Sequence, residues 1–170
     1  MYLVMRADKR IRNKIKFRDL DMEHTVPLTE EEIKKIQEIT VLFMTGDSDS
    51  VYPDFIEQPV PMISDRFKKL LEKYDSTTDY KKVIWNQIGE KQALYWTIFP
   101  KKISCISANS TYYPNGIIKE IRLNREQIGE HKVFRVEEKN NYDIIVHLDV
   151  AESIMRREPN GVLFTSIEVD

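Results

Sequence analysis

The local pattern that most constrains this sequence occurs twice, and each time a short apolar run leads into a predicted helix. In the first copy, at residues 60–74, the run ends at Ser64 and Asp65, whose side-chain oxygens can accept hydrogen bonds from the unpaired N–H groups of a helix start. Four apolar side chains then follow at helical spacing: Phe67, Leu70, Leu71 and Tyr74. This spacing gives a helix one apolar face, so the segment predicts a strand followed by a helix packed on a core.

The second copy lies near the C-terminus, at residues 144–158. After its apolar run, Asp149 and Glu152 have the spacing of a capping box, which satisfies backbone N–H groups at a helix start. The apolar stripe consists of Leu148, Ala151, Ile154 and Met155. Proline cannot continue a helix and Asn-Gly tolerates positive φ, so residues 159–161 predict a turn into a final strand over 162–169. We interpret both copies as ordinary core helices rather than as a duplication.

A longer helix is predicted from Thr29 to about Met44. Thr29 and Glu32 have capping-box spacing, which specifies the start of this helix. Its apolar face consists of Ile33, Ile36, Ile39, Thr40 and Phe43. The polar run 46–50 then breaks the pattern, and three prolines ending at Pro61 keep the chain extended, so a long surface loop is predicted here.

The remaining apolar runs are rich in aromatic and β-branched residues, which is typical of strands. Strands are predicted over residues 2–5, 82–88, 93–99, 103–107, 117–123, 132–137 and 142–146. Helices near both ends, without regular strand–helix alternation, favour the α+β class. We therefore expect a single domain over residues 1–170, with a mostly antiparallel sheet and about three helices.

Composition limits the class of protein further. The chain has 170 residues, of which 41% are hydrophobic and 32% charged, which suffices for one domain with a sizeable core. A lone cysteine, Cys105, excludes an internal disulfide framework, and the N-terminus lacks the apolar core of a signal peptide. No apolar run approaches the roughly 18 residues that cross a bilayer. We therefore expect a cytoplasmic protein without a membrane partner.

Charge is distributed unevenly, although the net charge is only −2. Residues 6–18 form a basic arm, and residues 29–58, which cover the predicted helix and loop, are strongly acidic. Ile11, Ile15 and Phe17 are interleaved with the basic residues, so we interpret the arm as a strand or irregular segment lying over a core. The small net charge also argues against general nucleic-acid binding, and we do not expect nucleic acid as a partner.

No motif predicts catalysis, a cofactor or a metal. Cys105 could form a thiolate pair with His131 or His147, but its flanking isoleucines favour a buried cysteine. The three histidines lack the spacing of metal sites, and the Asp-Ser-Asp run at residues 47–49 lacks the third oxygen ligand of a calcium loop. No glycine-rich phosphate-binding loop is present. We therefore expect no catalytic, cofactor-binding or metal-binding residues.

Several segments together carry a resemblance to a bacterial family. They are Tyr-Leu-Val-Met-Arg at residues 2–6, Ile-Ser-Asp-Arg-Phe-Lys-Lys-Leu-Leu-Glu at 63–72, Tyr95-Trp96, Ile-Gly-Glu-His-Lys-Val-Phe-Arg-Val at 128–136, and the strand–helix–strand at 144–169. In this order they are similar to the immunity proteins of polymorphic toxin systems, family eleven. That family often has a Cys-Leu-Asp-like element after its central strand, and Ser-Cys-Ile-Ser at 104–107 lacks the acidic residue.

The resemblance implies a protein that binds a cognate toxin domain and neutralises it by stoichiometric complex formation, without catalysis. Such an interface gains from charges that steer association and from aromatic anchors that slow dissociation. The candidate partner-binding residues are Glu30, Glu31, Asp47, Asp49, Tyr52, Phe55, Tyr112 and Tyr113. Acidic residues among them would suit a basic nuclease toxin.

Other interpretations stay open from the sequence. Tyr52 and Phe55 could pin the loop to the core while the glutamates form a solvated helix face, and we prefer this interpretation of that segment. The chain could be an enzyme whose pocket, lined by His131, His147 and carboxylates, assembles from distant segments. It could also be a non-inhibitory adaptor of a toxin system. The sequence makes no prediction about self-association.

Overall fold

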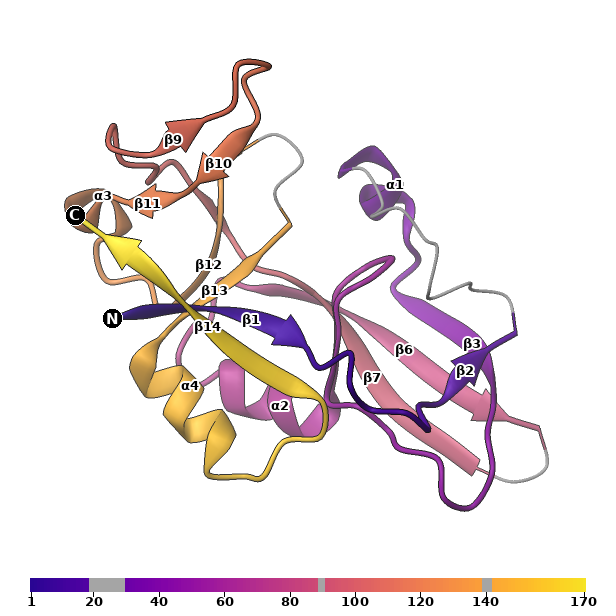
Figure 1. Cartoon of the computed structure of the whole chain (residues 1–170). Coiled ribbons are helices and arrows are strands. Elements are labelled where there is room, and N and C mark those ends of the chain that lie inside the picture. Colours follow the sequence, from indigo (N-terminus) through magenta and orange to yellow (C-terminus); the bar gives the residue numbers. More distant parts are fainter. Residues whose placement is uncertain (19–29, 89–90, 139–141) are drawn as a thin grey trace.

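Two six-stranded sheets form most of the structure, a computed structural model that describes residues 1–18, 30–88, 91–138 and 142–170 (Figure 1). Across the first sheet the strands are β11 (Arg122–Leu123), β14 (Val162–Val169), β1 (Tyr2–Ala7), β13 (Ile144–His147), β12 (Val133–Val136) and β8 (Lys102–Ile103). Across the second they are β2 (Lys16–Phe17), β3 (Ile39–Thr45), β6 (Asp79–Gln87), β7 (Lys91–Phe99), β5 (Met62–Ser64) and β4 (Phe55–Ile56). A separate hairpin consists of β9 (Thr111–Tyr112) and β10 (Ile118–Glu120).

Most strand pairs are antiparallel. β1 lies between β13 and β14, with Val4 opposite Ile145 on one side and Thr165 on the other, so both ends of the chain share one sheet. β6 and β7 form the longest pair, from Asp79↔Phe99 to Gln87↔Lys91. The pairs β3–β6, β8–β12 and β11–β14 are parallel. The predicted α+β class with mostly antiparallel sheet is confirmed.

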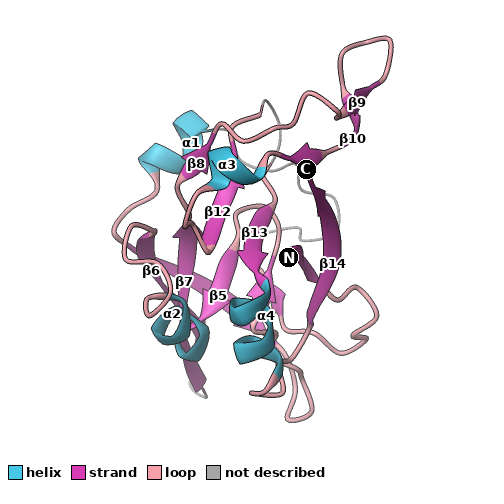
Figure 2. Ribbon diagram, turned by 90° about the vertical axis from the view of Figure 1, so that its left-hand side faces the viewer, coloured by secondary structure: helices cyan, strands magenta, loops and turns pink. Residues whose placement is uncertain are grey.

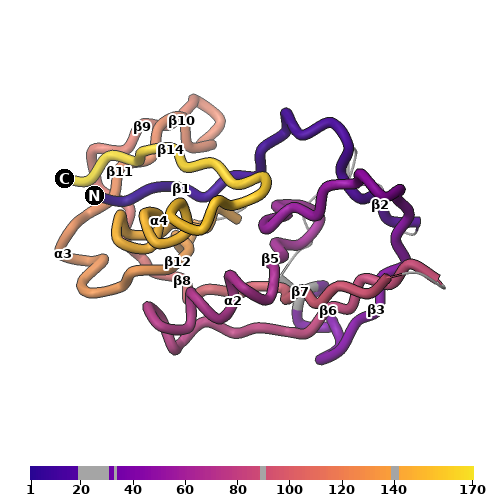
Figure 3. Tube along the Cα trace, turned by 90° about the horizontal axis from the view of Figure 1, so that it is seen from below, coloured from indigo at the N-terminus to yellow at the C-terminus, as the bar shows by residue number. Residues whose placement is uncertain are grey.

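The described residues contain four helices: α1 (Glu30–Lys35), α2 (Asp65–Leu71), the single turn α3 (Arg125–Ile128) and α4 (Leu148–Met155). α2 directly follows β5, and α4 directly follows β13, so both predicted strand–helix units are confirmed. α4 packs on β1 and β13 of the first sheet, and α2 packs on β5 and β7 of the second (Figures 2 and 3). The two helices also contact each other and thereby join the sheets.

The two helices begin differently from the predicted capping patterns. Ser64 is the N-cap residue of α2, but its hydroxyl donates a hydrogen bond of 2.6 Å to Asp54 instead of accepting one from the helix. The N-cap residue of α4 is His147, whose Nδ1 accepts the Asp149 N–H at 3.3 Å. The Asp149 carboxylate pairs with Lys132 at 2.7 Å, so the predicted cap role of Asp149 is wrong. In both helices, the side chain that the local pattern assigns to the cap instead binds a residue that is distant in the sequence.

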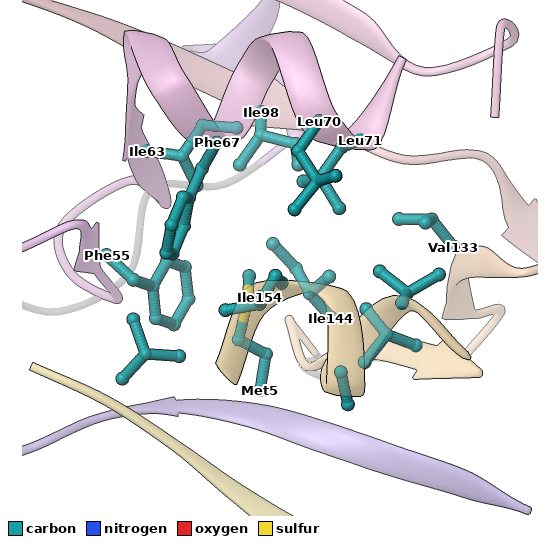
Figure 4. Close-up of a cluster of buried hydrophobic side chains, with 14 residues drawn as sticks. Met5, Phe55, Ile63, Phe67, Leu70, Leu71, Ile98, Val133, Ile144 and Ile154 are labelled. Atoms are coloured by element: carbon teal, nitrogen blue, oxygen red, sulfur yellow. The ribbon is translucent and has the colours of Figure 1, made fainter. Parts of the chain in front are cut away.

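The main core cluster lies between the sheets and takes residues from both of them and from α2 and α4 (Figure 4). Its buried members are Met5, Phe55, Ile63, Phe67, Leu70, Leu71, Ile98, Val133, Ile144, Val146, Val150, Ala151, Ile154 and Val162. Figure 4 shows Leu70 and Leu71 of α2 on one side of this cluster and Ile154 of α4 on the other. Because both sheets contribute to one cluster, the fold is a single domain.

The long predicted helix is wrong beyond Lys35. α1 ends at that residue, and the strand β3 follows. The run Ile-Thr-Val-Leu-Phe in β3 is rich in β-branched and aromatic residues, which favours a strand, and apolar residues on both faces of a strand also satisfy helical spacing. Met44 faces the core and Val41 faces outward, as the alternation of a strand requires. The predicted start of this helix, Thr29, lies outside the described residues.

The predicted surface loop after β3 is exposed only in its first part. The turn at 46–50 is exposed, whereas residues 53–56 are buried and include β4. Asp54 accepts hydrogen bonds from the Ser64 hydroxyl at 2.6 Å and from the Asn160 N–H at 2.8 Å. The segment therefore connects the start of α2 to the turn after α4. Prolines correctly indicated irregular backbone here, but they carry no information about burial.

Some predicted strands have different bounds. The predicted strand 103–107 is reduced to β8, and the predicted strand 117–123 is divided into β10 and β11. The basic arm 6–18 begins inside β1 and ends just past β2. Ile15 and Phe17 are buried, so the arm lies over a core as the interleaved apolar residues indicated.

Candidate partner-binding surface

The second sheet carries a contiguous apolar surface that is open to solvent. We call it the exposed sheet face, and it consists of Ile39, Val41, Phe43, Ile84 and Leu94. The exposed fractions are 54% for Ile39, 48% for Val41, and 38% each for Phe43 and Leu94, while Ile84 is half-buried. Single exposed apolar residues are common, but a contiguous group of on the order of 300 Å² is as large as the largest apolar patch on a typical monomer, and such patches are often functional.

The strand register brings these side chains together. Val41 lies opposite Ile84, and Ile84 lies opposite Leu94, so the three form a row across β3, β6 and β7. Ile39 and Phe43 lie two residues before and after Val41, and side chains two apart in a strand point to the same face. The surface is therefore fixed by backbone pairing, and its formation needs no side-chain rearrangement.

Polar side chains border this row on the same face. Lys82 lies opposite Ile39, and Asn86 lies opposite Phe43. Gln92 on β7 lies opposite Asn86 and continues the border. An apolar centre with a polar rim is the arrangement found at protein–protein interfaces.

The helix α2 covers the same face of the sheet at its other end. Ile98 is fully buried there, and Trp96, between Ile98 and Leu94, is half-buried. The Trp96 indole N–H donates to Asp65 of α2 at 2.9 Å, and Lys68 Nζ lies 4.6 Å from the centroid of the indole ring. Figure 1 shows β6 and β7 continuing well past α2. The exposed sheet face is therefore the continuation of a core face beyond the helix that covers it.

The opposite face of this sheet is closed. Trp85 and Tyr95 stack there with ring centroids 3.3 Å apart, and Phe17 of the basic arm packs edge-on against Trp85 at 4.8 Å. Burial raises the pKa of Tyr95, whose hydroxyl donates to the Pro53 carbonyl at 2.8 Å. Ile36, just after α1, packs against the same cluster. A partner that binds this sheet would therefore meet the other face.

The predicted acidic residues lie in two separate places. Glu31 is exposed on α1, before β3, and the side chain of Glu30 lies outside the described structure. Asp47 and Asp49 are exposed in the turn after β3. Seven residues of strand at about 3.3 Å each put the two groups roughly 20 Å apart. Because of this separation, the predicted acidic residues do not form one acidic patch. Asp47 also stabilises its own turn by accepting a hydrogen bond from the Ser50 hydroxyl at 3.0 Å.

The predicted aromatic anchors are also divided. Phe55 is 2% exposed and belongs to the main core cluster, so the alternative in which it pins the loop to the core is confirmed. Tyr52 is half-buried, with its ring 6.4 Å from that of Trp85. Tyr112 and Tyr113 are 49% and 51% exposed on the β9–β10 hairpin, which Figure 1 shows well apart from β3. Only the hairpin tyrosines are open enough to serve as anchors.

The proposed thiolate pair has no structural support. Cys105 is fully buried, and burial raises the pKa of its thiol to about 11, so the thiol is protonated at neutral pH. His147 forms the cap of α4 and packs edge-on against Tyr2, with ring centroids 5.2 Å apart. Cys105 itself belongs to a core cluster that also contains Tyr2 and Ile145, so both residues have structural contacts.

A small polar pocket of about 380 Å³ lies where the end of α2 meets the loop after α3. Its lining consists of Tyr74, Asp75, Ser76, Glu130, His131 and Lys132. The Asp75 carboxylate accepts hydrogen bonds from both Thr77 and Thr78 at 2.6 Å, so it already stabilises the turn after α2. The pocket thus brings His131 near carboxylates, as the enzyme alternative expected, but His147 does not line it.

Within the described residues, no group of three or more histidine, cysteine or acidic side chains is arranged to hold a metal ion. The helices of the described chain all lack the length and apolar character needed to cross a membrane.

Comparison with known proteins adds no assignment. The sequence matches no protein-family model and no curated protein. The resemblance to the immunity proteins therefore stays a prediction.

The exposed sheet face is the candidate site that sequence reasoning missed. Ile39 and Phe43 were assigned to the buried side of a helix, and they are exposed residues of β3. The signal was the alternation at the start of this strand, where Ile39, Val41 and Phe43 make one side apolar while Leu42 and Met44 make the other side apolar as well. Apolar residues on both faces of a strand indicate either burial on both sides or a surface for a partner.

Proposed function

We propose that this protein acts by binding another protein, with the exposed sheet face at the centre of the interface. The observation that carries this proposal is the row Val41–Ile84–Leu94, an apolar strip held rigid by strand pairing and bordered by polar side chains. Burying on the order of 300 Å² of apolar surface would contribute up to about 7 kcal/mol before the costs of association. The strip lies on a paired sheet rather than on a loop, which reduces the ordering cost of binding.

We propose that the partner is a toxin domain of the same bacterium, which complex formation neutralises in the cytoplasm. The family resemblance supports this partner, and neutralisation by binding needs an interface and no catalyst. Glu31 precedes β3 and Asp49 follows it, and attraction from these two exposed charges could steer a basic toxin towards this part of the molecule. Tyr113 could contribute only to a partner large enough to reach the hairpin.

The polar pocket supports a second candidate, an enzyme that uses His131 as a proton acceptor. His131 and Glu130 line the same pocket, and a histidine beside a carboxylate in a pocket is a common arrangement for proton transfer. We place it second because the nearby Asp75 carboxylate already holds a turn. Turnover of a small substrate that the substitution His131→Ala abolishes, in a variant that remains folded, would favour this candidate.

Co-expression tests the proposed function. The full chain is expressed together with the toxic domain encoded beside it, and growth and co-purification are scored in the same cells. The proposal predicts that growth is rescued and that the two proteins purify together in a fixed ratio. An active toxin that the chain neither binds nor neutralises would contradict the proposal. Binding without rescue would instead support the adaptor alternative.

The proposed steering role of the acidic residues has its own test. Charge reversal at Glu31 and Asp49 is expected to slow association and to reduce its dependence on salt, while dissociation changes little. Asp8→Lys on the basic arm serves as the control reversal, because Asp8 lies outside the proposed interface. Equal association rates for all three variants would remove these acidic residues from the interface.

A further inference from the structure

A cavity of about 660 Å³ lies between the basic arm and residues 53–58. Apolar side chains that line it include Ile15, Phe17, Phe55 and Ile56, which belong to the core clusters under the arm. Pockets that bind small molecules typically measure about 300–1,000 Å³ and have a largely apolar lining with a few polar groups. The size and the apolar part of the lining are therefore those of a small-molecule site.

The polar part of the lining is strongly positive. Four basic side chains of the arm line the cavity: Lys9, Arg12, Lys14 and Lys16. Among the described residues, the only acidic one that lines it is Glu57, and its carboxylate accepts Arg6 at 2.9 Å and the Ala7 N–H at 3.2 Å. Glu57 therefore pairs with a cation outside the basic set, Arg6, which also pairs with Asp143.

The other nearby carboxylate is also occupied. Asp8 accepts two side-chain hydrogen bonds from Arg10, each of 2.9 Å. Within the part of the chain that the structure describes, none of the four basic side chains at the cavity forms an ion pair. Burial lowers the pKa of Lys14, and repulsion from Lys9 adds to this effect, although Asp8 opposes both. In the described structure, the cavity lining thus carries four basic side chains against the single carboxylate of Glu57, and Asp8 is a further acidic neighbour of Lys14.

We propose that this cavity binds a small organic anion in which a carboxylate, sulfonate or phosphate group is attached to an apolar body. The apolar body would lie against Phe17, Phe55 and Ile56, and the anionic group would face the basic side chains at the mouth. Charge complementarity selects an anion, and the apolar lining selects against small hydrated ions. The proposal does not depend on toxin binding, because the cavity and the exposed sheet face have no residue in common.

A pair of fluorescent probes tests the proposal on the full chain. Anilinonaphthalene sulfonate has aromatic rings and a sulfonate, and phenylnaphthylamine has the same rings without the charge. The proposal predicts saturable binding of the sulfonate at one site per chain and binding of the neutral probe at least about tenfold weaker. Decanoate should displace the sulfonate, whereas inorganic phosphate at the same concentration should not. Displacement by phosphate alone would overturn the requirement for an apolar body.

Substitutions locate the probe. Lys14→Gln is expected to weaken sulfonate binding roughly tenfold and to leave phenylnaphthylamine binding unchanged, because it removes one charged contact. Lys119→Gln on the β9–β10 hairpin is the charge-matched control, and Val41→Ser tests binding at the exposed sheet face. Neither should change the affinity, and thermal unfolding checks that each variant is folded. Equal affinities for wild type and Lys14→Gln, or a loss specific to Val41→Ser, would overturn the proposal.

Discussion

Replacing Asp54 with alanine is predicted to lower the free energy of unfolding by about 3–4 kcal/mol. The Asp54 side chain is 5% exposed, and its carboxylate accepts hydrogen bonds from Ser64 at 2.6 Å, from Arg66 Nε at 2.7 Å and from the Asn160 N–H at 2.8 Å. Arg66 Nη2 donates to the same carboxylate. These contacts tie the segment before β4, the start of α2 and the turn before β14 to one buried group.

The magnitude follows from these contacts. A hydrogen bond to a charged group contributes about 1.5–3 kcal/mol, so the four bonds give roughly 6–12 kcal/mol if they are simply added. Desolvation of the carboxylate offsets part of this sum, and the Arg66 side chain, which is 46% exposed, regains water when its partner is removed. The remaining loss is about 3–4 kcal/mol. Asp54→Asn keeps one acceptor oxygen but turns its NH2 group towards two of the four donors and loses the charge, so a loss of about 3 kcal/mol, close to that of alanine, is expected.

The same residue predicts a pH dependence. Burial alone would raise the pKa of the Asp54 carboxyl, but hydrogen bonds from Arg66, Ser64 and Asn160 outweigh burial and hold that pKa below its usual value. A carboxyl whose pKa is lower in the folded state stabilises the fold above its unfolded pKa of about 3.9. That stabilisation is lost as the pH falls through the lower folded pKa. The stability difference between wild type and Asp54→Asn should therefore shrink in acid.

Urea denaturation, followed by tryptophan fluorescence and far-ultraviolet circular dichroism, measures these changes. With a slope of about 2 kcal/mol/M, Asp54→Ala should lower the midpoint by about 1.5–2 M. Asp8→Asn is the control, because Asp8 forms its ion pair with the exposed Arg10 and should leave the midpoint unchanged. An Asp54→Ala midpoint as close to wild type as that of the control would refute the reasoning.

Two further predictions test other parts of the structure. Val83 is 1% exposed, so Val83→Ala should lower the free energy of unfolding by about 2 kcal/mol. Val41, one strand away, is 48% exposed, so Val41→Ala should change that free energy by less than about 0.5 kcal/mol. Equal losses of stability in chemical denaturation would show that the exposed sheet face is covered within the chain. Cys105, buried and with a pKa of about 11, should react with a disulfide reagent at pH 8 only after denaturation; rapid reaction of the native protein would contradict the buried position.

The sequence predicted best where three local signals agree. Residues 60–74 and 144–158 combine an apolar run, a helix-start signal and helical spacing, and both strand–helix units form as predicted. Their caps differ because the Ser64 hydroxyl bonds to Asp54 and the Asp149 carboxylate pairs with Lys132. Capping patterns are local, and they contain no information about the partners that the fold brings near.

The prediction failed where periodicity was ambiguous. Apolar residues on both faces of β3 fit a helical stripe, and only pairing with β6 decides for the strand. This pairing links residues about forty positions apart, which no local window detects. The same long-range pairing creates the row of Val41, Ile84 and Leu94, so the candidate interface could not be found without the sheet. Phe55 shows the converse, because a segment punctuated by prolines carries a core residue.

The most direct test of the proposed interface compares two leucines of matched exposure. Leu94 on the exposed sheet face is 38% exposed, and Leu163 on β14 of the other sheet is 37% exposed. The dissociation constant of the complex with the toxin domain is measured by calorimetry for Leu94→Asp and Leu163→Asp. Burying an unpaired carboxylate at the interface should weaken binding by Leu94→Asp at least about a hundredfold, while Leu163→Asp binds like wild type. Equal affinity of the two variants would contradict the central claim that the exposed sheet face binds the partner.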